Sequence, residues 1–185
     1  MIEETLADGE RKMQSAVQVL REDLGTIRTG RATPSLIESL EVEYFGTPMP
    51  LMQLAQIHAA DARQLVIQPY DRTVIKEIDK ALMKSNLGLS ASNDGAVMRI
   101  NVPALTEDRR KEMVKMVHKR VEEHKVAVRN VRRTVQDQFK SAEKAKTQSA
   151  DELKRAEDKL QKLTDRIVAE MDALGRDKEK EVSAV

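Results

Sequence analysis

Basic side chains gather on one flank of a helical segment in the second half of the chain, and they are the residues best placed to do chemistry. From Val114 to Val135, valines, with His124 in one place, recur every three or four residues, the pattern of a helix that packs along a narrow seam. With Val114 at heptad position a, positions e, b and f fall together on one side of that seam. These positions hold two glutamates and the following cations: Lys111, Lys115, Lys119, Lys125, Arg129, Arg132 and Arg133. A one-sided cationic stripe is typical of phosphate binding.

The same stripe has a plainer interpretation, a solvated helix face whose charges pair with neighbouring helices. Two features favour the functional one: acidic residues are scarce on that flank, and Arg129–Arg133 is rich in arginine, whose planar guanidinium fits phosphate oxygens. Aromatic residues make up only 2% of the chain, so base stacking is a poor basis for binding. We therefore expect the flank to recognise structured RNA by its shape and backbone.

No residue pattern in the chain is typical of catalysis. Residues Gly25–Ala32 approach the spacing of a phosphate-binding loop, but Arg31 stands where that loop needs lysine and Ala32 where it needs serine or threonine. The three histidines lack the spacing of helix-borne metal ligands, and His124 lies on the seam, where a hydrogen-bonded core residue is expected. We expect a binding protein that is not an enzyme and uses no metal or cofactor.

Three segments share the seam pattern and would form the scaffold that positions the basic flank. They span residues 6–27, 114–135 and 153–174, and Ser149 with Glu152 forms a capping box in front of the third. Because three similar seams can bury one another, the pattern predicts an elongated antiparallel three-helix bundle and a monomer. A dimeric coiled coil is the alternative.

Residues 31–104 interrupt the helical pattern with β-rich sequence. Strands are predicted at 36–44, 65–67 and 97–102, with a short helix at 74–82 and turn signals between these elements. The sequence therefore predicts the α+β class, with a small β-rich α+β domain inserted between the first two helices of the bundle.

The predicted boundaries give a bundle of residues 1–30 and 105–185 and an inserted domain of residues 31–104. Both connections fall at chain breakers, near Gly30 and Pro103. Since two links lie at one place, we expect an interdomain hinge there. It comprises Gly30, Arg31, Ala32, Pro103, Ala104 and Leu105.

Composition narrows the possible location and partners. The formal net charge is +1, so only the arrangement of charges argues for a polyanionic partner, and the absence of cysteine excludes disulfides and thiolate chemistry. The first residues lack the features of a secretory signal, and no stretch approaches the roughly 20 apolar residues of a membrane span. We expect a cytoplasmic protein without a membrane partner.

Seven short segments carry a resemblance to a known family. They are Ile27–Leu36, Val42–Leu51, Gln53–Ala55, Ser85–Leu89, Leu105–Lys111, Val128–Arg133 and Gln161–Asp165. In these segments, which follow the family's order and span nearly the whole chain, the sequence resembles bacterial ribosome recycling factors.

The resemblance implies an L-shaped molecule of two domains with roughly the dimensions of transfer RNA. It also implies binding to the large subunit of a post-termination ribosome, through ribosomal RNA. Together with elongation factor G, and with GTP hydrolysis on that partner, the family splits the ribosome into subunits. This chain itself would bind no nucleotide.

Matching family positions nominate Arg110, Arg129 and Arg132 as contacts with ribosomal RNA, and the heptad pattern independently places the last two on the basic flank. With further residues of the flank and of the predicted hinge, the candidate RNA contacts are Arg28, Arg31, Arg110, Lys125, Arg129, Arg132 and Arg133. Met49 and Met52 stand where polar or basic residues are expected in many relatives, so the sequence does not predict which partner the surface around them contacts.

Two other classes of function stay open at this point. A general nucleic-acid-binding helical protein would bind any duplex, and its activity would not depend on elongation factor G. A structural coiled coil would self-associate and respond little to salt.

Overall fold

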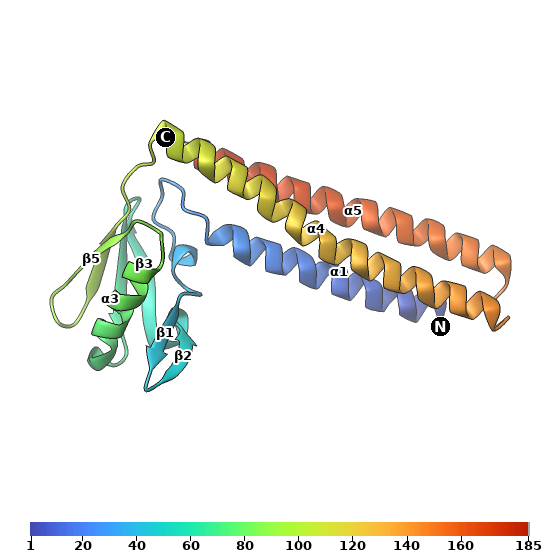
Figure 1. Ribbon diagram of the computed structural model, residues 1–185, viewed down its shortest axis with the longest axis horizontal. Coiled ribbons are helices and arrows are strands. Elements are labelled where there is room, and N and C mark those ends of the chain that lie inside the picture. Colours follow the sequence, from blue (N-terminus) through green and yellow to red (C-terminus); the bar gives the residue numbers. More distant parts are fainter. Residues whose placement is uncertain (185) are drawn as a thin grey trace. The chain divides into compact units, whose positions relative to one another are not determined.

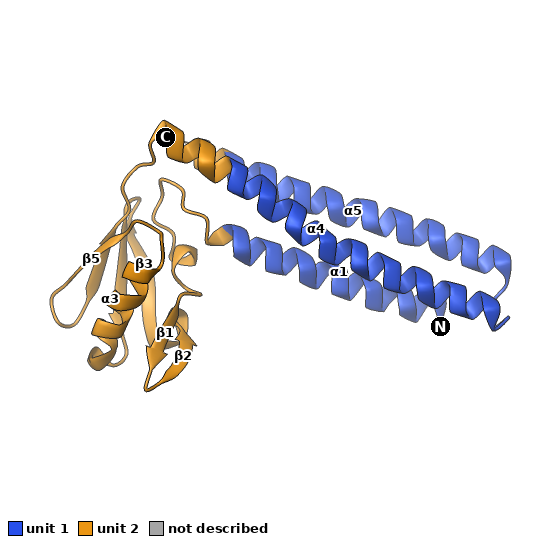
Figure 2. Cartoon of the chain, viewed as in Figure 1, with its two compact units in different colours: residues 1–24, 115–179 blue, residues 25–114, 180–185 orange. Residues whose placement is uncertain are grey.

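The computed structural model describes residues 1–184, which divide into two compact units (Figure 2). Unit 1 comprises residues 1–24 and 115–179, and unit 2 comprises residues 25–114 with the chain from Lys180. Three long helices run through the molecule: α1 (Ile2–Gly25), α4 (Glu107–Lys144) and α5 (Ala150–Ser183) (Figure 1). The first turns of α4 and the end of α5 therefore belong to unit 2.

Unit 1 is a three-helix bundle whose core is built from the apolar seams. The largest of its fully buried side chains are Met13, Leu20, Leu160, Ile167 and Met171, and the buried valines of α4 lie among them. Such burial contributes about 1.5–3 kcal/mol for each large aliphatic side chain. The pairs Glu3–Lys159 and Glu10–Arg166 follow the same order along α1 and α5, so these two helices run parallel. The pairs His118–Glu179 and Lys125–Asp172 follow opposite orders along α4 and α5, so these two run antiparallel.

Two glycines allow α4 to approach both neighbouring helices closely. A Cβ atom added to Gly9 of α1 would lie 2.9 Å from a methyl carbon of Val135, and one added to Gly175 of α5 would lie 2.9 Å from a methyl carbon of Val121. Both valines belong to the seam predicted from the sequence. The bundle is therefore packed tightly enough that a single methyl group would disturb it.

Side-chain caps fix the starts of α4 and α5. At the start of α4 the Thr106 hydroxyl accepts a hydrogen bond from the Arg109 backbone N–H at 3.2 Å. At the start of α5 the Ser149 hydroxyl accepts from the Glu152 N–H at 3.2 Å, and the Glu152 carboxylate accepts from the Ser149 N–H at 3.0 Å. This reciprocal pair is the predicted capping box, and it satisfies N–H groups that the helix leaves without partners.

A two-stranded antiparallel sheet opens the β-rich part of unit 2. Strands β1 (Glu41–Tyr44) and β2 (Thr47–Pro50) are joined by Phe45 and Gly46, whose φ angles are 48° and 79°. Positive φ at both central residues is the geometry that a two-residue hairpin needs to match the twist of its strands.

The main sheet of unit 2 has four antiparallel strands in the order β3-β4-β6-β5. They are β3 (Ala55–Asp61), β4 (Gln64–Pro69), β5 (Ser90–Asn93) and β6 (Met98–Asn101). Strand β4 lies inside the sheet and buries its three central apolar residues, whereas β3 and β5 lie at the edges. Asp94 closes the turn between β5 and β6 by accepting hydrogen bonds from two backbone N–H groups, of which the Val97 N–H is the first cause of the lowered pKa of its carboxyl.

Helix α3 (Ile75–Lys84) packs its apolar face into the same core as the sheet. Ile75, Ile78 and Leu82 are buried together with residues of β4 and β6. A short 3-10 turn, η2 (Arg72–Val74), precedes the helix, and its cap is Asp71. The remaining elements are the 3-10 turn η1 (Pro34–Leu36) and the short helix α2 (Leu51–Leu54).

The predicted α+β class, with three long helices and a small inserted sheet, is confirmed, but parts of the strand prediction are wrong. The strand expected over residues 36–44 is limited to Glu41–Tyr44, because η1 occupies its start. Strands β2, β3 and β5 were not predicted. Within residues 1–184, no helix is long and apolar enough to cross a bilayer.

Candidate nucleic-acid interface

The basic flank predicted on α4 consists of columns of side chains with different surroundings. The column at heptad position e faces α5, where His118 Nε2 lies 2.8 Å from Glu179 and Lys125 Nζ lies 2.6 Å from Asp172. In the same column, Arg132 Nη2 donates a hydrogen bond to the side chain of Gln161 at 2.6 Å. Acidic partners are scarce on the flank of α4 itself, as the sequence indicated, but α5 supplies carboxylates to His118 and Lys125.

Lys125, one of the predicted RNA contacts, already has partners within the bundle. Its side chain is buried, and its ammonium group binds Asp172 at 2.6 Å and Glu122 at 3.0 Å. Burial lowers the pKa of Lys125, but the hydrogen bonds to the two carboxylates outweigh burial and raise this pKa above its ordinary value. The charge of Lys125 is therefore engaged by side chains of unit 1.

The cations that remain open to solvent are mostly those of columns b and f. Arg129 exposes 63% of its side chain, although a Glu122 carboxylate oxygen lies 3.8 Å away. Arg133 and Lys115 are exposed and make no ion pair within residues 1–184. Together with Lys119, which lies 3.9 Å from a Glu123 carboxylate oxygen, and the half-buried Arg132, they form two groups along α4. We call these two groups the α4 basic surface: Lys115 and Lys119, then Arg129, Arg132 and Arg133.

The opposite flank of α4 is tied to α1. Asp23 binds the guanidinium of Arg120, and it lies 2.6 Å from His124 Nε2. His124 is hydrogen-bonded, as predicted, but it is half-buried and not a core residue. Since one flank of α4 contacts α1 and the other contacts α5, only the outer columns can meet a large partner.

Arg110 lies on the part of α4 that belongs to unit 2. Its side chain is half-buried, and its Nη2 donates to the carbonyl of Leu105 at 3.4 Å. Arg31 and Arg63 line the same cavity of about 310 Å³. Arg63 was not predicted, because it stands alone in the turn between β3 and β4 and only folding brings it there. Three guanidinium groups around one cavity favour an anion.

Arg28 fastens segments of unit 2 that are distant in the sequence. It donates through Nη1 to the carbonyl of Leu87 at 3.1 Å and through Nη2 to the carbonyl of Pro103 at 2.9 Å, and its Nε is buried without a partner. Burial, followed by the charge of Arg109, lowers the pKa of Arg28. Gly88 makes room for this arrangement, since a Cβ there would stand 3.2 Å from Nη1. Arg28 therefore stabilises the fold of unit 2, and both of its terminal nitrogens already donate to backbone carbonyls instead of being free for RNA.

The residues of the predicted hinge all lie in unit 2. Ala32 and Leu105 are buried, and the Ala32 N–H donates to the Ala62 carbonyl at 2.8 Å. Arg31, Pro103 and Ala104 are exposed. A Cβ on Gly30 would meet no atom within 4 Å. Nothing in its surroundings therefore requires glycine there.

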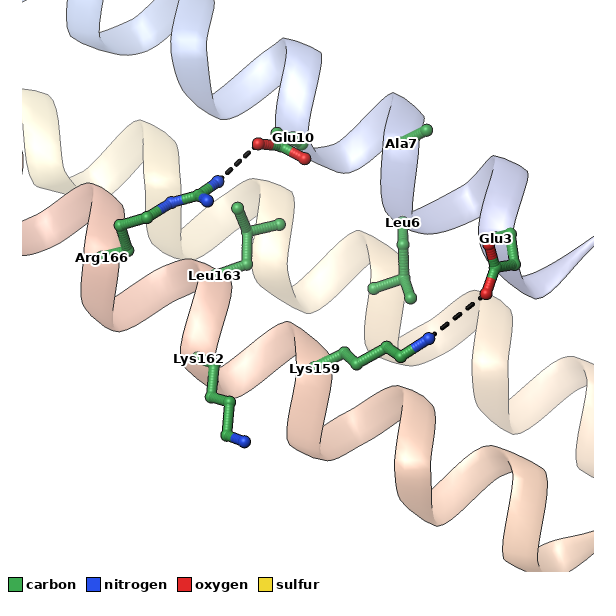
Figure 3. A pocket seen from close by; sticks show the side chains of 8 residues that line it. All are labelled: Glu3, Leu6, Ala7, Glu10, Lys159, Lys162, Leu163 and Arg166. Carbon is green, nitrogen blue, oxygen red and sulfur yellow. Dashed lines mark hydrogen bonds and ion pairs between the residues drawn. The ribbon is translucent and has the colours of Figure 1, made fainter.

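A groove between α1 and α5 is lined by charged and apolar side chains (Figure 3). Its volume is about 440 Å³, with Leu6 and Leu163 inside it. Lys159 pairs with Glu3 across it at 3.2 Å, and Arg166 pairs with Glu10. Carboxylates that each bind a cation are poorly suited to acid–base chemistry. Within the described residues, no group of His, Asp and Glu could hold a metal ion.

Comparison with known proteins agrees with the family resemblance of the seven segments. The family model described as "Ribosome recycling factor" matches residues 20–182. A ribosome-recycling factor of Dehalococcoides mccartyi (strain CBDB1) is 51% identical over 185 residues, and that of Bacillus subtilis (strain 168) is 48% identical, with all of each chain covered.

Two solved structures also match the whole chain. A solution structure of the ribosome recycling factor has a TM-score of 0.73 at 38% identity, with 98% of that chain covered. The T. thermophilus ribosome recycling factor, in a structure that also holds the E. coli elongation factor G bound to the E. coli post-termination complex, has a TM-score of 0.68 at 43% identity, with 100% of that chain covered.

Proposed function

The chain belongs to the ribosome recycling factor family, and from this premise we propose that it binds the post-termination ribosome and promotes its splitting into subunits. Elongation factor G is the partner, and GTP is hydrolysed on that partner. This chain acts by binding and is not an enzyme. Its place of action is the cytoplasm, where the ribosomes are.

The α4 basic surface is the observation that carries this proposal. Its cations lie along one side of a helix of 38 residues, and the solvent-facing columns make few contacts with the rest of the bundle. A row of cations on a straight helix can follow the phosphates of a folded RNA without reading its bases. With so few aromatic side chains, affinity must come from phosphate contacts, which release counterions.

Within the predicted set of RNA contacts, the surroundings of each residue suggest a division of roles. Arg129, Arg132 and Arg133 belong to the α4 basic surface, and we propose that they contact ribosomal RNA directly. Arg110 and Arg31 would bind an anion at the cavity of unit 2. We assign Lys125 and Arg28 to the support of these surfaces, because their charged groups already have partners within the chain.

We further propose that the predicted domains, residues 1–30 with 105–185 and residues 31–104, move as separate bodies during splitting. The bundle would stay bound to RNA while elongation factor G displaces the β-rich domain. The chain has no cysteine, so a cross-link between two introduced cysteines, one in each body, would be specific. The locked protein should still bind ribosomes but fail to split them. Normal splitting by the locked protein would exclude the hinge.

Binding to isolated large ribosomal subunits, measured at increasing salt, tests the RNA surface. Each of Arg129→Ala, Arg132→Ala and Arg133→Ala should reduce the slope of log affinity against log salt by roughly 0.7–0.9, the value for one phosphate contact. Arg11→Ala is the matched control, since Arg11 is exposed on α1 and pairs only with Asp8 of the same helix.

The outcomes of this experiment separate the remaining classes of function. Equal affinity for an arbitrary RNA duplex would indicate a general nucleic-acid binder. Self-association without affinity for ribosomes would indicate a structural coiled coil. If Arg11→Ala weakens binding as much as the three variants of α4, the α4 basic surface has no special part in recognition.

A further inference from the structure

Arg132 differs from the other cations of its column in the chemistry of its partner. Lys125 and His118 each face a carboxylate of α5, whereas Arg132 faces the neutral side chain of Gln161. No carboxylate of the described residues lies within ion-pairing distance of Arg132. Its positive charge is therefore held in place without being cancelled.

The three donor nitrogens of Arg132 are in different states. Nη2 donates to Gln161 Oε1 at 2.6 Å, and Nε is buried without a partner. Nη1 makes no hydrogen bond within residues 1–184 and is not among the buried unpartnered atoms. Nη1 is thus the nitrogen left for an external acceptor, and the contact of Nη2 fixes the direction in which it points.

Asp165 determines which way the amide of Gln161 faces. Gln161 Nε2 donates to Asp165 Oδ1 at 2.8 Å, one helical turn along α5. An ionised carboxylate can only accept hydrogen bonds, so it selects the NH₂ side of the amide and turns the oxygen towards Arg132. Asp165, Gln161 and Arg132 therefore form a chain of hydrogen bonds with one direction of donation.

We propose that Gln161 and Asp165 are positioning residues that orient the guanidinium of Arg132 towards a phosphate oxygen of ribosomal RNA. This inference rests on the proposed function, in which Arg132 contacts RNA. Preorganisation of a flexible arginine raises affinity, because the side chain loses less freedom when it binds. The α5 helix thus takes part in recognition although the basic surface lies on α4.

Binding of the full chain to large ribosomal subunits tests this inference with two pairs of variants. Gln161→Met keeps the size of the side chain and removes the acceptor, and it should weaken binding roughly two- to tenfold, the equivalent of one hydrogen bond. Gln14→Met is the control on the exposed face of α1. Asp165→Asn and Asp165→Ala remove the same charge, but only asparagine keeps an oxygen that can accept from Gln161. Asp165→Asn should therefore bind more tightly than Asp165→Ala.

A double-mutant cycle separates positioning from general stability. In an Arg132→Ala background, Gln161→Met should cause no further loss of affinity, and thermal unfolding should confirm that every variant is folded. The inference is wrong if Gln161→Met binds like the native chain or weakens both backgrounds equally. An Arg132→Ala variant with native affinity would also overturn it, and would identify the RNA role of Arg132 as the failing premise.

Discussion

Val121 of α4 and Gly175 of α5 pack in direct contact, with no room for a methyl group between them. Gly175→Ala gains about 1 kcal/mol of helix propensity. The new Cβ would nevertheless stand 2.9 Å from Val121 Cγ2, and a valine side chain is too short and stiff to move aside. We expect a net loss of about 1 kcal/mol in the free energy of unfolding, measured by urea denaturation.

Two comparisons make this prediction specific. Val121→Ala in the Gly175→Ala background should recover part of the loss, because it removes the clashing methyl groups. Gly30→Ala should change stability little, because its Cβ meets no atom within 4 Å. A Gly175→Ala protein more stable than the native chain would mean that α4 and α5 separate without penalty.

The ion pairs of Lys125 predict a loss of stability at alkaline pH. In the folded chain, burial lowers the pKa of Lys125 and the hydrogen bonds to Asp172 and Glu122 raise it by more. The stabilisation is thus fully present below the unfolded pKa near 10.5 and is lost as the pH rises through the higher folded pKa. Lys125→Met should cost about 1 kcal/mol, since both carboxylates also reach solvent.

Urea unfolding of native protein and Lys125→Met from pH 7 to pH 11 measures this effect. The difference in the free energy of unfolding between the two proteins should be constant from pH 7 and shrink above about pH 10.5. Lys115→Met serves as the control, because Lys115 is exposed and forms no ion pair among the described residues. A difference that persists unchanged at the highest pH would show that packing of the lysine stem is what matters.

The capping box of α5 predicts a sensitivity to acid. The Ser149 backbone N–H, and then its hydroxyl, lower the pKa of the Glu152 carboxyl. The contribution of this carboxylate is present above its unfolded pKa near 4.5 and disappears as the pH falls through the lower folded pKa.

Thermal unfolding of Glu152→Gln measures the contribution of the Glu152 carboxylate to stability. The variant should unfold roughly 1–2 °C below the native chain at pH 7, and the gap between the two unfolding temperatures should narrow as the pH falls below about 4.5. Asp151→Asn removes the same charge from the same turn without a capping contact. If both variants behave alike, the effect comes from the helix dipole alone.

Arg28 should stabilise unit 2 through backbone carbonyls. Arg28→Ala removes the hydrogen bonds to Leu87 and Pro103, and we expect a loss of about 2 kcal/mol in the free energy of unfolding. Arg28→Lys has one ammonium group for two separate carbonyls and should recover only part of the loss. Arg31→Ala is the neighbouring control, since its side chain is exposed. Equal effects of Arg28→Ala and Arg31→Ala on unfolding would contradict a structural role for Arg28.

The long helices could be predicted from the sequence because apolar spacing and capping residues are local signals. Valine spacing gave the seam of α4, and Ser149 with Glu152 gave the start of α5. Strand β3 could not be found in this way, since Ala55–Asp61 contains small and polar residues and is held by pairing with β4. Strand β5 (Ser90–Asn93) also consists of small and polar residues, and it is held by its pairing with β6.

The candidate site shows a similar limit. A helical wheel correctly placed Arg129 and Arg133 on an open face, but it could not show that Asp172 and Gln161 of another helix reach Lys125 and Arg132. Pairing between helices depends on their rotation about their axes, which a single-helix pattern does not contain. Tertiary contacts thus separate the open cations from the engaged ones.

The groove between α1 and α5 makes one edge of the bundle chemically unlike the edge where Val121 meets Gly175. Part of the attraction at the groove comes from Glu3 with Lys159 and Glu10 with Arg166, which are largely exposed and which mobile ions therefore screen. At the α4–α5 edge the contact of valine with glycine carries no charge, and the pair of Lys125 with Asp172 is screened less because the lysine is buried. Breathing of the first turns of α1, seen as amide hydrogen exchange, should therefore follow ionic strength. We therefore expect the α1–α5 edge of the bundle to loosen more in salt than the α4–α5 edge.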